Sequence, residues 1–140
     1  MFEYLMPQLI MPAYPDTLLT RMCQSAVDRQ IDWGKECGVP WGISESGYDS
    51  FDPLQNYQYH AFGVPGLGLR RGLGDDVVIA PYATLMALII EPQQAYDNLL
   101  VLEKNGARGQ FGFYEALDYT ASRMARGQVY AIVQSYMAHH

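Results

Sequence analysis

Residues 41–73 form a long stretch with no steady helical or strand period, in a chain of only 140 residues. The stretch is rich in glycine and aromatic residues, and Glu45 lies inside the string Ile-Ser-Glu-Ser. An irregular segment of this length in a compact domain is usually either functional or disordered. Its aromatic side chains argue against disorder, because disordered segments are poor in them. We therefore predict a loop that builds a binding site.

The composition is that of a single globular domain, with 49% hydrophobic and 17% charged residues. A formal net charge of -6 argues against a nucleic-acid partner, because binding phosphates needs clustered Lys and Arg. The glycines between Gly63 and Gly72 do not make a nucleotide loop, since no strand is expected before them and no Gly-Lys-Ser/Thr follows. Arg70 or Arg71 is predicted to pair with an acid of the loop.

Cysteine and histidine spacing predicts neither a disulfide nor a metal site. Cys23 and Cys37 fall on one predicted helix, where 14 residues at 1.5 Å each separate them by about 21 Å, far beyond disulfide reach. We expect both thiols to be reduced, as in a cytosolic setting. His60 is isolated and His139 and His140 are adjacent, so no ligand spacing is present. We expect no metal and no cofactor.

Apolar periodicity and end signals predict a helical chain. The best-defined helix spans 16–37, with Asp16 or Thr17 as its cap and Gly38 at its end. Proline starts are expected for helices at 81–90 and 92–104, and a last helix is expected at 128–140. Only "DDVVIAP" has a strand-like composition, and no apolar run reaches the length of a membrane span. The lack of a membrane-length apolar run predicts a soluble fragment. The alternation of helices and long loops predicts an all-α toroid.

The stretch 41–73 and a second glycine- and aromatic-rich loop, "GARGQFGFYEALDYT", have the side chains of a carbohydrate site. Sugars are bound by aromatic faces and by planar polar groups that reach the hydroxyls. The alternative to a binding role is that the aromatic residues form a core beneath the loops. The predicted substrate-binding residues are Trp41, Tyr48, Asp49, Asn56, Tyr57, Gln58 and Tyr59 in the first loop, and Tyr114 and Asp118 in the second.

Two acids are candidates for catalysis. Glycoside chemistry uses a pair of carboxyl groups across the scissile bond, and Glu45 and Glu115 each have aromatic and small neighbours. An acid beside aromatic walls is also where a raised carboxyl pKa is expected. The alternatives are that Glu45 caps a turn and that Glu115 opens a helix, where acids are favoured.

Several long strings carry a resemblance to a known family. "MFEYLMP", "GVPWGISES", "NYQYHAFGVPGLGLRRGL", "VIAPYATLMAL", "GARGQFGFYEALDYT" and "YMAHH" resemble the glucoamylase-like domain of cyclic β-1,2-glucan synthases. The resemblance implies a partial (α/α)6 toroid, with this chain as the C-terminal part of the domain, truncated at both ends. It also implies a large inner-membrane parent protein with this region on the cytoplasmic side. In that family a β-1,2-glucan is elongated from UDP-glucose elsewhere, and this domain is implied in retaining, ring-closing transglycosylation.

The resemblance further implies roles for the two acids. Glu45, in "WGISES", stands where the transglycosylating family has Glu and where related inverting hydrolases carry a small residue. This difference implies that Glu45 is the nucleophile. Glu115 is the in-chain candidate for the second carboxyl group or for a substrate contact, but the family's acid/base could lie upstream of Met1. The implied partners are a β-1,2-glucan and other domains of the parent, and self-association is expected. An inverting β-1,2-glucan hydrolase and a non-catalytic glucan-binding fragment are the alternatives.

Overall fold

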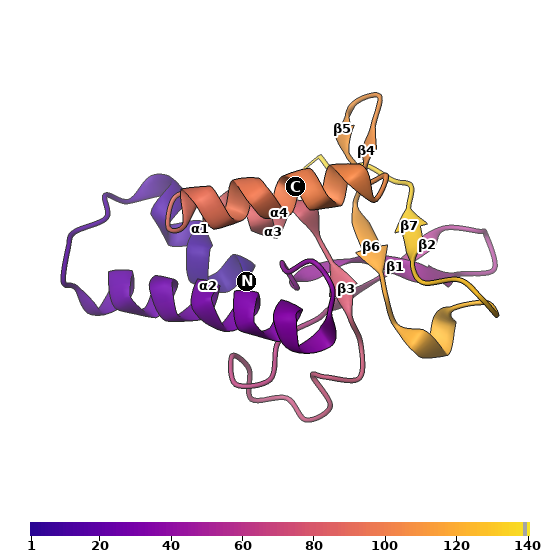
Figure 1. The fold of residues 1–140 in the computed structure, drawn as a ribbon, viewed down its shortest axis with the longest axis horizontal. Coiled ribbons are helices and arrows are strands. Elements are labelled where there is room, and N and C mark those ends of the chain that lie inside the picture. Colours follow the sequence, from indigo (N-terminus) through magenta and orange to yellow (C-terminus); the bar gives the residue numbers. More distant parts are fainter. Residues whose placement is uncertain (139) are drawn as a thin grey trace.

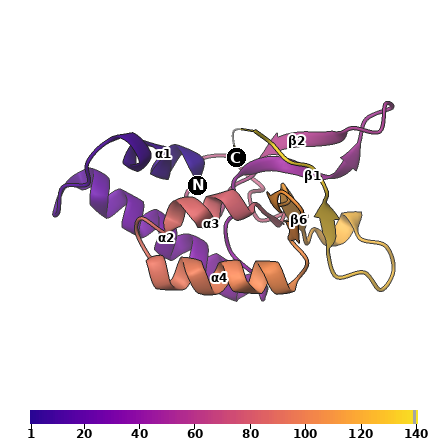
Figure 2. The same cartoon turned by 90° about the horizontal axis from the view of Figure 1, so that it is seen from above.

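The computed structural model describes residues 1–138 and 140 and divides into a helical part and a β-rich part. Figures 1 and 2 show the four helices on one side and most of the strands on the other, with both ends of the chain near the junction in Figure 2. Two strand pairs and one three-stranded sheet, of order β3-β6-β7, make up the β part, and all pairings are antiparallel. The elements are α1 (Phe2–Ile10), α2 (Leu18–Cys37), β1 (Glu45–Phe51), β2 (Tyr57–Ala61), β3 (Val78–Ile79), α3 (Pro81–Ala87), α4 (Pro92–Lys104), β4 (Arg108–Gly109), β5 (Gly112–Phe113), β6 (Ala116–Asp118), a 3-10 turn (Ala121–Arg123) and β7 (Ala131–Val133).

The predicted all-α fold, and with it the partial toroid, is wrong. The structure is a mixed α/β domain, in which four helices accompany three small antiparallel sheets within the described residues. The expected helix at 128–140 is replaced by β7, whose Ala131–Val133 pairs with β6. The expected irregular loop contains the β1–β2 hairpin, with a register shift between Tyr48 and Phe51. β-branched and aromatic side chains in these segments favour strands, but the segments are short and lack clean alternation.

The predicted central helices are confirmed, with small shifts in their ends. Thr17 caps α2 by accepting the Thr20 backbone N–H at 3.3 Å, and Gly38 ends it with φ +68°. Pro81 and Pro92 start α3 and α4, where a missing N–H costs nothing. α1 was not predicted, because Pro7 lies inside it and proline usually interrupts a helix.

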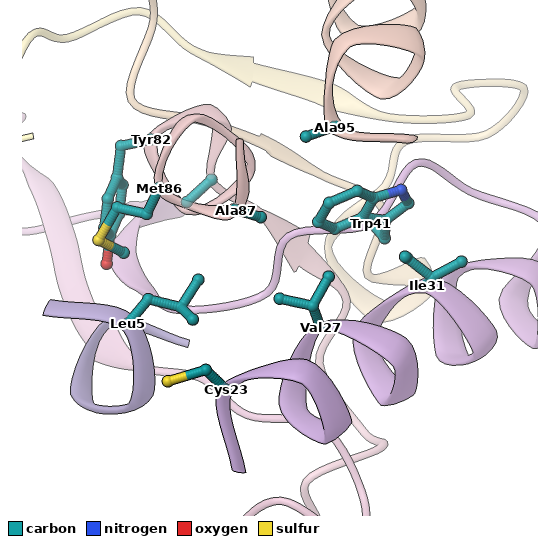
Figure 3. Close-up of a cluster of buried hydrophobic side chains, with 10 residues drawn as sticks. Leu5, Cys23, Val27, Ile31, Trp41, Tyr82, Met86, Ala87 and Ala95 are labelled. Atoms are coloured by element: carbon teal, nitrogen blue, oxygen red, sulfur yellow. The ribbon is translucent and has the colours of Figure 1, made fainter. Parts of the chain in front are cut away.

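Two buried clusters connect the parts of the domain. Figure 3 shows Leu5 of α1, Cys23 and Val27 of α2 and Met86 of α3 converging on one core. The second cluster joins α4 to the strands and the loops. It comprises Ile43, Val64, Ile79, Leu99, Leu102, Ala107 and Leu117. Burial of these side chains is the main favourable contribution to folding. The β1–β2 hairpin packs instead on the three-stranded sheet, where Tyr48 and Tyr57 cover a third cluster of Val78, Ala116 and Val133.

Candidate active site

The β1–β2 hairpin sets the direction of the Glu45 side chain. Glu45 pairs with Ala61 and Gly47 with Tyr59 across the two strands. Directly opposed residues in an antiparallel pair share a face, and side chains two residues apart in one strand do so too. Glu45 and Tyr59 therefore project from the same face, with Gly47 leaving an open position between them.

Glu115 lies against this open position. Its Oε1 accepts the backbone N–H of Gly47 at 2.9 Å, and a Cβ atom at Gly47 would be 3.2 Å from Glu115 Cγ. Glu45 and Gly47 are two residues apart on a strand, a backbone distance of about 7 Å. The structure therefore brings the two predicted acids to one end of the hairpin, although they are far apart in sequence.

Glu115 and Asp118 have a similar structural role. Both accept backbone N–H groups of β1: Glu115 binds Gly47, and Asp118 Oδ2 binds Asp49 N at 3.0 Å. Asp118 is fully buried and also accepts from Arg123, whose Nε lies 2.6 Å from Oδ2. Since Thr120 N donates to Oδ1 as well, both Asp118 oxygens are occupied by protein groups. Asp118 thus holds β1, Arg123 and the following turn together.

His140 links Glu115 to two tyrosines. Its Nδ1 lies 3.1 Å from Glu115 Oε2, and its ring stacks on Tyr82 with centroids 3.8 Å apart and planes 16° apart. Its Nε2 lies 3.4 Å from the Tyr59 hydroxyl. Sequence reasoning gave His140 no role, because nothing in its spacing connects it to residue 115. His139 lies outside the described residues.

The two tyrosine hydroxyls stay protonated at neutral pH. Burial, assisted by the negative charges of Glu45 and Glu115, raises the pKa of Tyr59 to about 12. Burial also raises the pKa of Tyr82 well above its usual value, partly offset by the bond to Ser44. Tyr82 donates to Ser44 Oγ at 2.7 Å and contacts the Glu45 carbonyl oxygen at 3.0 Å. Both phenols are therefore hydrogen-bond donors beside the two carboxyl groups.

Glu45 lines a pocket of about 220 Å³. Of the hydrogen bonds and ion pairs between described residues, none uses its carboxylate; only its carbonyl oxygen accepts, from Tyr82. This differs from Glu115, both of whose oxygens have partners. Arg70 is at the same pocket, but its guanidinium contacts His60, and no ion pair between described residues joins Arg70 or Arg71 to an acid of the loop. The other walls include Tyr4, Ser44, Phe62, Leu67 and Leu73.

The remaining predicted sugar contacts are dispersed. Tyr48 and Gln58 pair on the opposite face of the hairpin and bond to each other at 2.9 Å. Asn56 bonds to Asp52 in the turn of the hairpin. The other four are the buried Trp41, Asp49 on β1, Tyr57 beside Phe51, and Tyr114 beside Tyr136. Of the nine predicted binding residues, Tyr59 is the one that is on the Glu45 face of the hairpin and whose hydroxyl is influenced by the charges of both Glu45 and Glu115.

Two buried amides hold the segment that leads to Glu45. Gln30 accepts Ile43 N at 2.8 Å and donates to Ile43 O at 2.7 Å. Asn98 accepts Trp41 N at 3.1 Å and donates to Trp41 O at 2.8 Å. Each amide thus satisfies both backbone groups of one residue, so neither group is left unpaired in the core. These bonds fix the backbone immediately before Glu45.

Replacing Asn98 by Ala tests this backbone support. The change leaves the buried Trp41 N–H without its acceptor, and we expect a loss of about 2–3 kcal/mol in the free energy of unfolding. Gln93→Ala is the control, because Gln93 is exposed on the same helix and its side chain donates to the exposed Asp97. Denaturant unfolding measures both. Equal losses in the two variants would contradict a specific role for Asn98.

Comparison with known proteins identifies the family. Residues 1–140 match the family model Glycoamylase, described as "Putative glucoamylase". The chain belongs to the Glycoamylase family. The match confirms the resemblance predicted from the sequence strings.

One curated relative connects this Glycoamylase chain to glucan synthesis. It is 46% identical over 140 residues to the cyclic beta-(1,2)-glucan synthase NdvB of Rhizobium meliloti (strain 1021). The alignment covers 100% of this chain and 5% of that relative. The Glycoamylase region thus corresponds to a small part of a much larger synthase.

None of the helices in residues 1–138 is long and apolar enough to cross a membrane. No group of three or more His, Cys, Asp or Glu side chains in the described part of the chain could hold a metal ion.

Proposed function

We propose that this region belongs to a cyclic β-1,2-glucan synthase and takes part in closing the glucan ring by retaining transglycosylation. Family membership and the 46% identity to a named synthase support the substrate class. The synthase's other activities are assigned to other parts of that protein. Glu45 is the proposed nucleophile.

The observation that carries this proposal is the contrast between the two acids. Glu45 is half-buried at a pocket, and its carboxylate has no hydrogen-bond partner among the described residues. Glu115 is 4% exposed, and both of its oxygens are occupied by Gly47 and His140. A nucleophile must reach the anomeric carbon, and Glu45, which is more exposed and is held by no hydrogen bond to its carboxylate among the described residues, is better placed for this than Glu115.

The reaction proceeds by two displacements. Glu45 attacks C1 of a glucosyl unit, the bond from C1 to the O2 of the neighbouring unit breaks, and that oxygen takes a proton from a carboxylic acid. The free 2-hydroxyl at the other end of the enzyme-bound chain then attacks C1 and gives its proton to the same acid's conjugate base. The Glu45 ester bond breaks, and a ring with the original β configuration results.

Glu115 is assigned a positioning role in this scheme. Its bond to Gly47 fixes the strand that begins at Glu45, and its bond to His140 fixes the ring stacked on Tyr82. We assign the proton donor to a carboxyl group from another segment of the parent protein. Tyr59, as a protonated phenol, is suited to donate to a sugar oxygen or to the Glu45 carboxylate.

The configuration of newly released sugar ends tests this function. When water replaces the 2-hydroxyl as acceptor, the synthase is expected to release β reducing ends first, because two displacements retain configuration. Proton NMR in the first minutes, before mutarotation, distinguishes the anomers. Initial release of α ends would support an inverting hydrolase instead.

A further inference from the structure

A second pocket lies beside Glu115. It has a volume of about 220 Å³, and Glu115, Tyr82 and His140 line it. Tyr82 and His140 form the stacked pair described above, and Tyr82 also contacts the Glu45 carbonyl. The two pockets share no lining residue, and the Tyr82 side chain, which lines the second pocket and contacts the Glu45 backbone, lies between them. Its remaining walls are Leu85, Phe111, Phe113, Tyr136 and Met137.

An exposed aromatic pair forms one wall of this second pocket. Phe111 is 78% exposed, Tyr136 is 41% exposed, and their rings are 5.6 Å apart in an edge-on arrangement. Phe111 lies in the turn between β4 and β5, which projects at the top of Figure 1. Exposure of so large an apolar ring beside a cavity points to a ligand, because exposed apolar patches often mark binding surfaces.

The Phe111 turn is held in place. Gly109 packs so closely on Tyr114 and Tyr136 that an added Cβ atom would overlap both hydroxyl groups. The backbone N–H of Phe111 also points at the Tyr136 hydroxyl, at 3.5 Å. A ring held in this way loses little conformational freedom when a ligand binds, which favours affinity.

We propose that this second pocket is a subsite for one glucosyl unit of the β-1,2-glucan chain. Aromatic walls with a few polar groups are the usual lining of small-ligand sites. A glucose ring offers C–H faces to Phe111 and Tyr136, while a sugar hydroxyl can donate to Glu115, whose oxygens each accept one protein hydrogen bond and keep a second lone pair. The proposal rests on the proposed function for the identity of the glucan, but it concerns binding and not the reacting atoms.

Phe111→Ala in the complete synthase tests the subsite. The KM for linear β-1,2-glucan in ring closure is expected to rise about tenfold, with kcat within about twofold, because the ring contributes to binding. Phe111→Trp keeps an aromatic face and is expected to restore KM. Tyr14→Ala is the matched control, since Tyr14 is 65% exposed and lies in the segment between α1 and α2. Isothermal titration with the same glucan gives the affinity without turnover.

Each outcome decides the proposal. A tenfold loss of affinity in Phe111→Ala alone supports it. An unchanged affinity and KM would overturn it, and a lower melting temperature with unchanged glucan affinity would show instead that Phe111 contacts protein. Failure of the proposed function can be distinguished from failure of the subsite. If Glu45→Gln still closes rings while Phe111→Ala binds glucan weakly, the subsite is supported and the assignment of Glu45 as nucleophile is wrong.

Discussion

Replacing Glu45 by Gln in the complete synthase is expected to abolish ring closure, with a fall of at least about a thousandfold in its rate. An amide cannot form the glycosyl ester, so the first displacement fails. In the proposed function, elongation from UDP-glucose belongs to another part of the synthase, so it is expected to continue. Linear β-1,2-glucans are therefore expected to accumulate, and chromatography with mass spectrometry of the glucan fraction measures both products.

The Glu45 variant has a matched control and a defined contrary result. Gln has nearly the shape of Glu, and the Glu45 carboxylate makes no hydrogen bond among the described residues, so folding should be preserved. Glu103→Gln changes an exposed acid, paired with Arg108 on the surface, and should leave ring closure intact. Undiminished cyclic glucan from Glu45→Gln would remove Glu45 from the mechanism and redirect attention to Glu115.

Replacing Gly42 by Ala is expected to cause the largest loss of stability, about 3 kcal/mol or more. Gly42 has φ +121°, a conformation that other residues rarely adopt, and an added Cβ atom would lie 2.7 Å from Thr84 Oγ1 and 3.3 Å from Ala80 O. The variant therefore combines backbone strain with a clash in the core. Denaturant unfolding followed by circular dichroism measures the loss.

Gly112→Ala separates these two effects. Gly112 has a nearly identical φ of +117°, but nothing lies within 4 Å of its added Cβ atom. It should therefore lose only the strain contribution, about 1–2 kcal/mol. Equal losses at Gly42 and Gly112 would show that the clash with Thr84 is relieved at no cost, contrary to the support described for the segment before Glu45.

Local signals were enough to predict α2, α3 and α4. Thr17, Gly38, Pro81 and Pro92 act through neighbouring backbone groups, so their effect can be deduced from adjacent residues. The strands could not be found in this way. β7 is a three-residue strand that exists by pairing with β6, and such long-range pairing leaves little trace in a short string of residues.

The same distinction applies to the site. The choice of Glu45, Glu115 and Tyr59 followed from residue types in unusual loops, and the structure brings these three together. Asp118 also lies in an aromatic-rich loop of the sequence and was predicted to bind sugar for that reason. In the structure it is buried, and its carboxylate accepts hydrogen bonds from Arg123 and two backbone N–H groups. His140 was missed because its contact with Glu115 depends on how the C-terminal segment returns to the hairpin.

The most direct test of the central claim is to identify the carboxylate that carries the glucan during ring closure. The synthase is mixed with linear β-1,2-glucan, acid-quenched during turnover, digested with pepsin and examined by mass spectrometry. The predicted result is a glucan-modified peptide containing Glu45, with fragmentation that assigns the ester to that residue. A glucan ester on Glu115, or on any other carboxylate, would contradict the assignment.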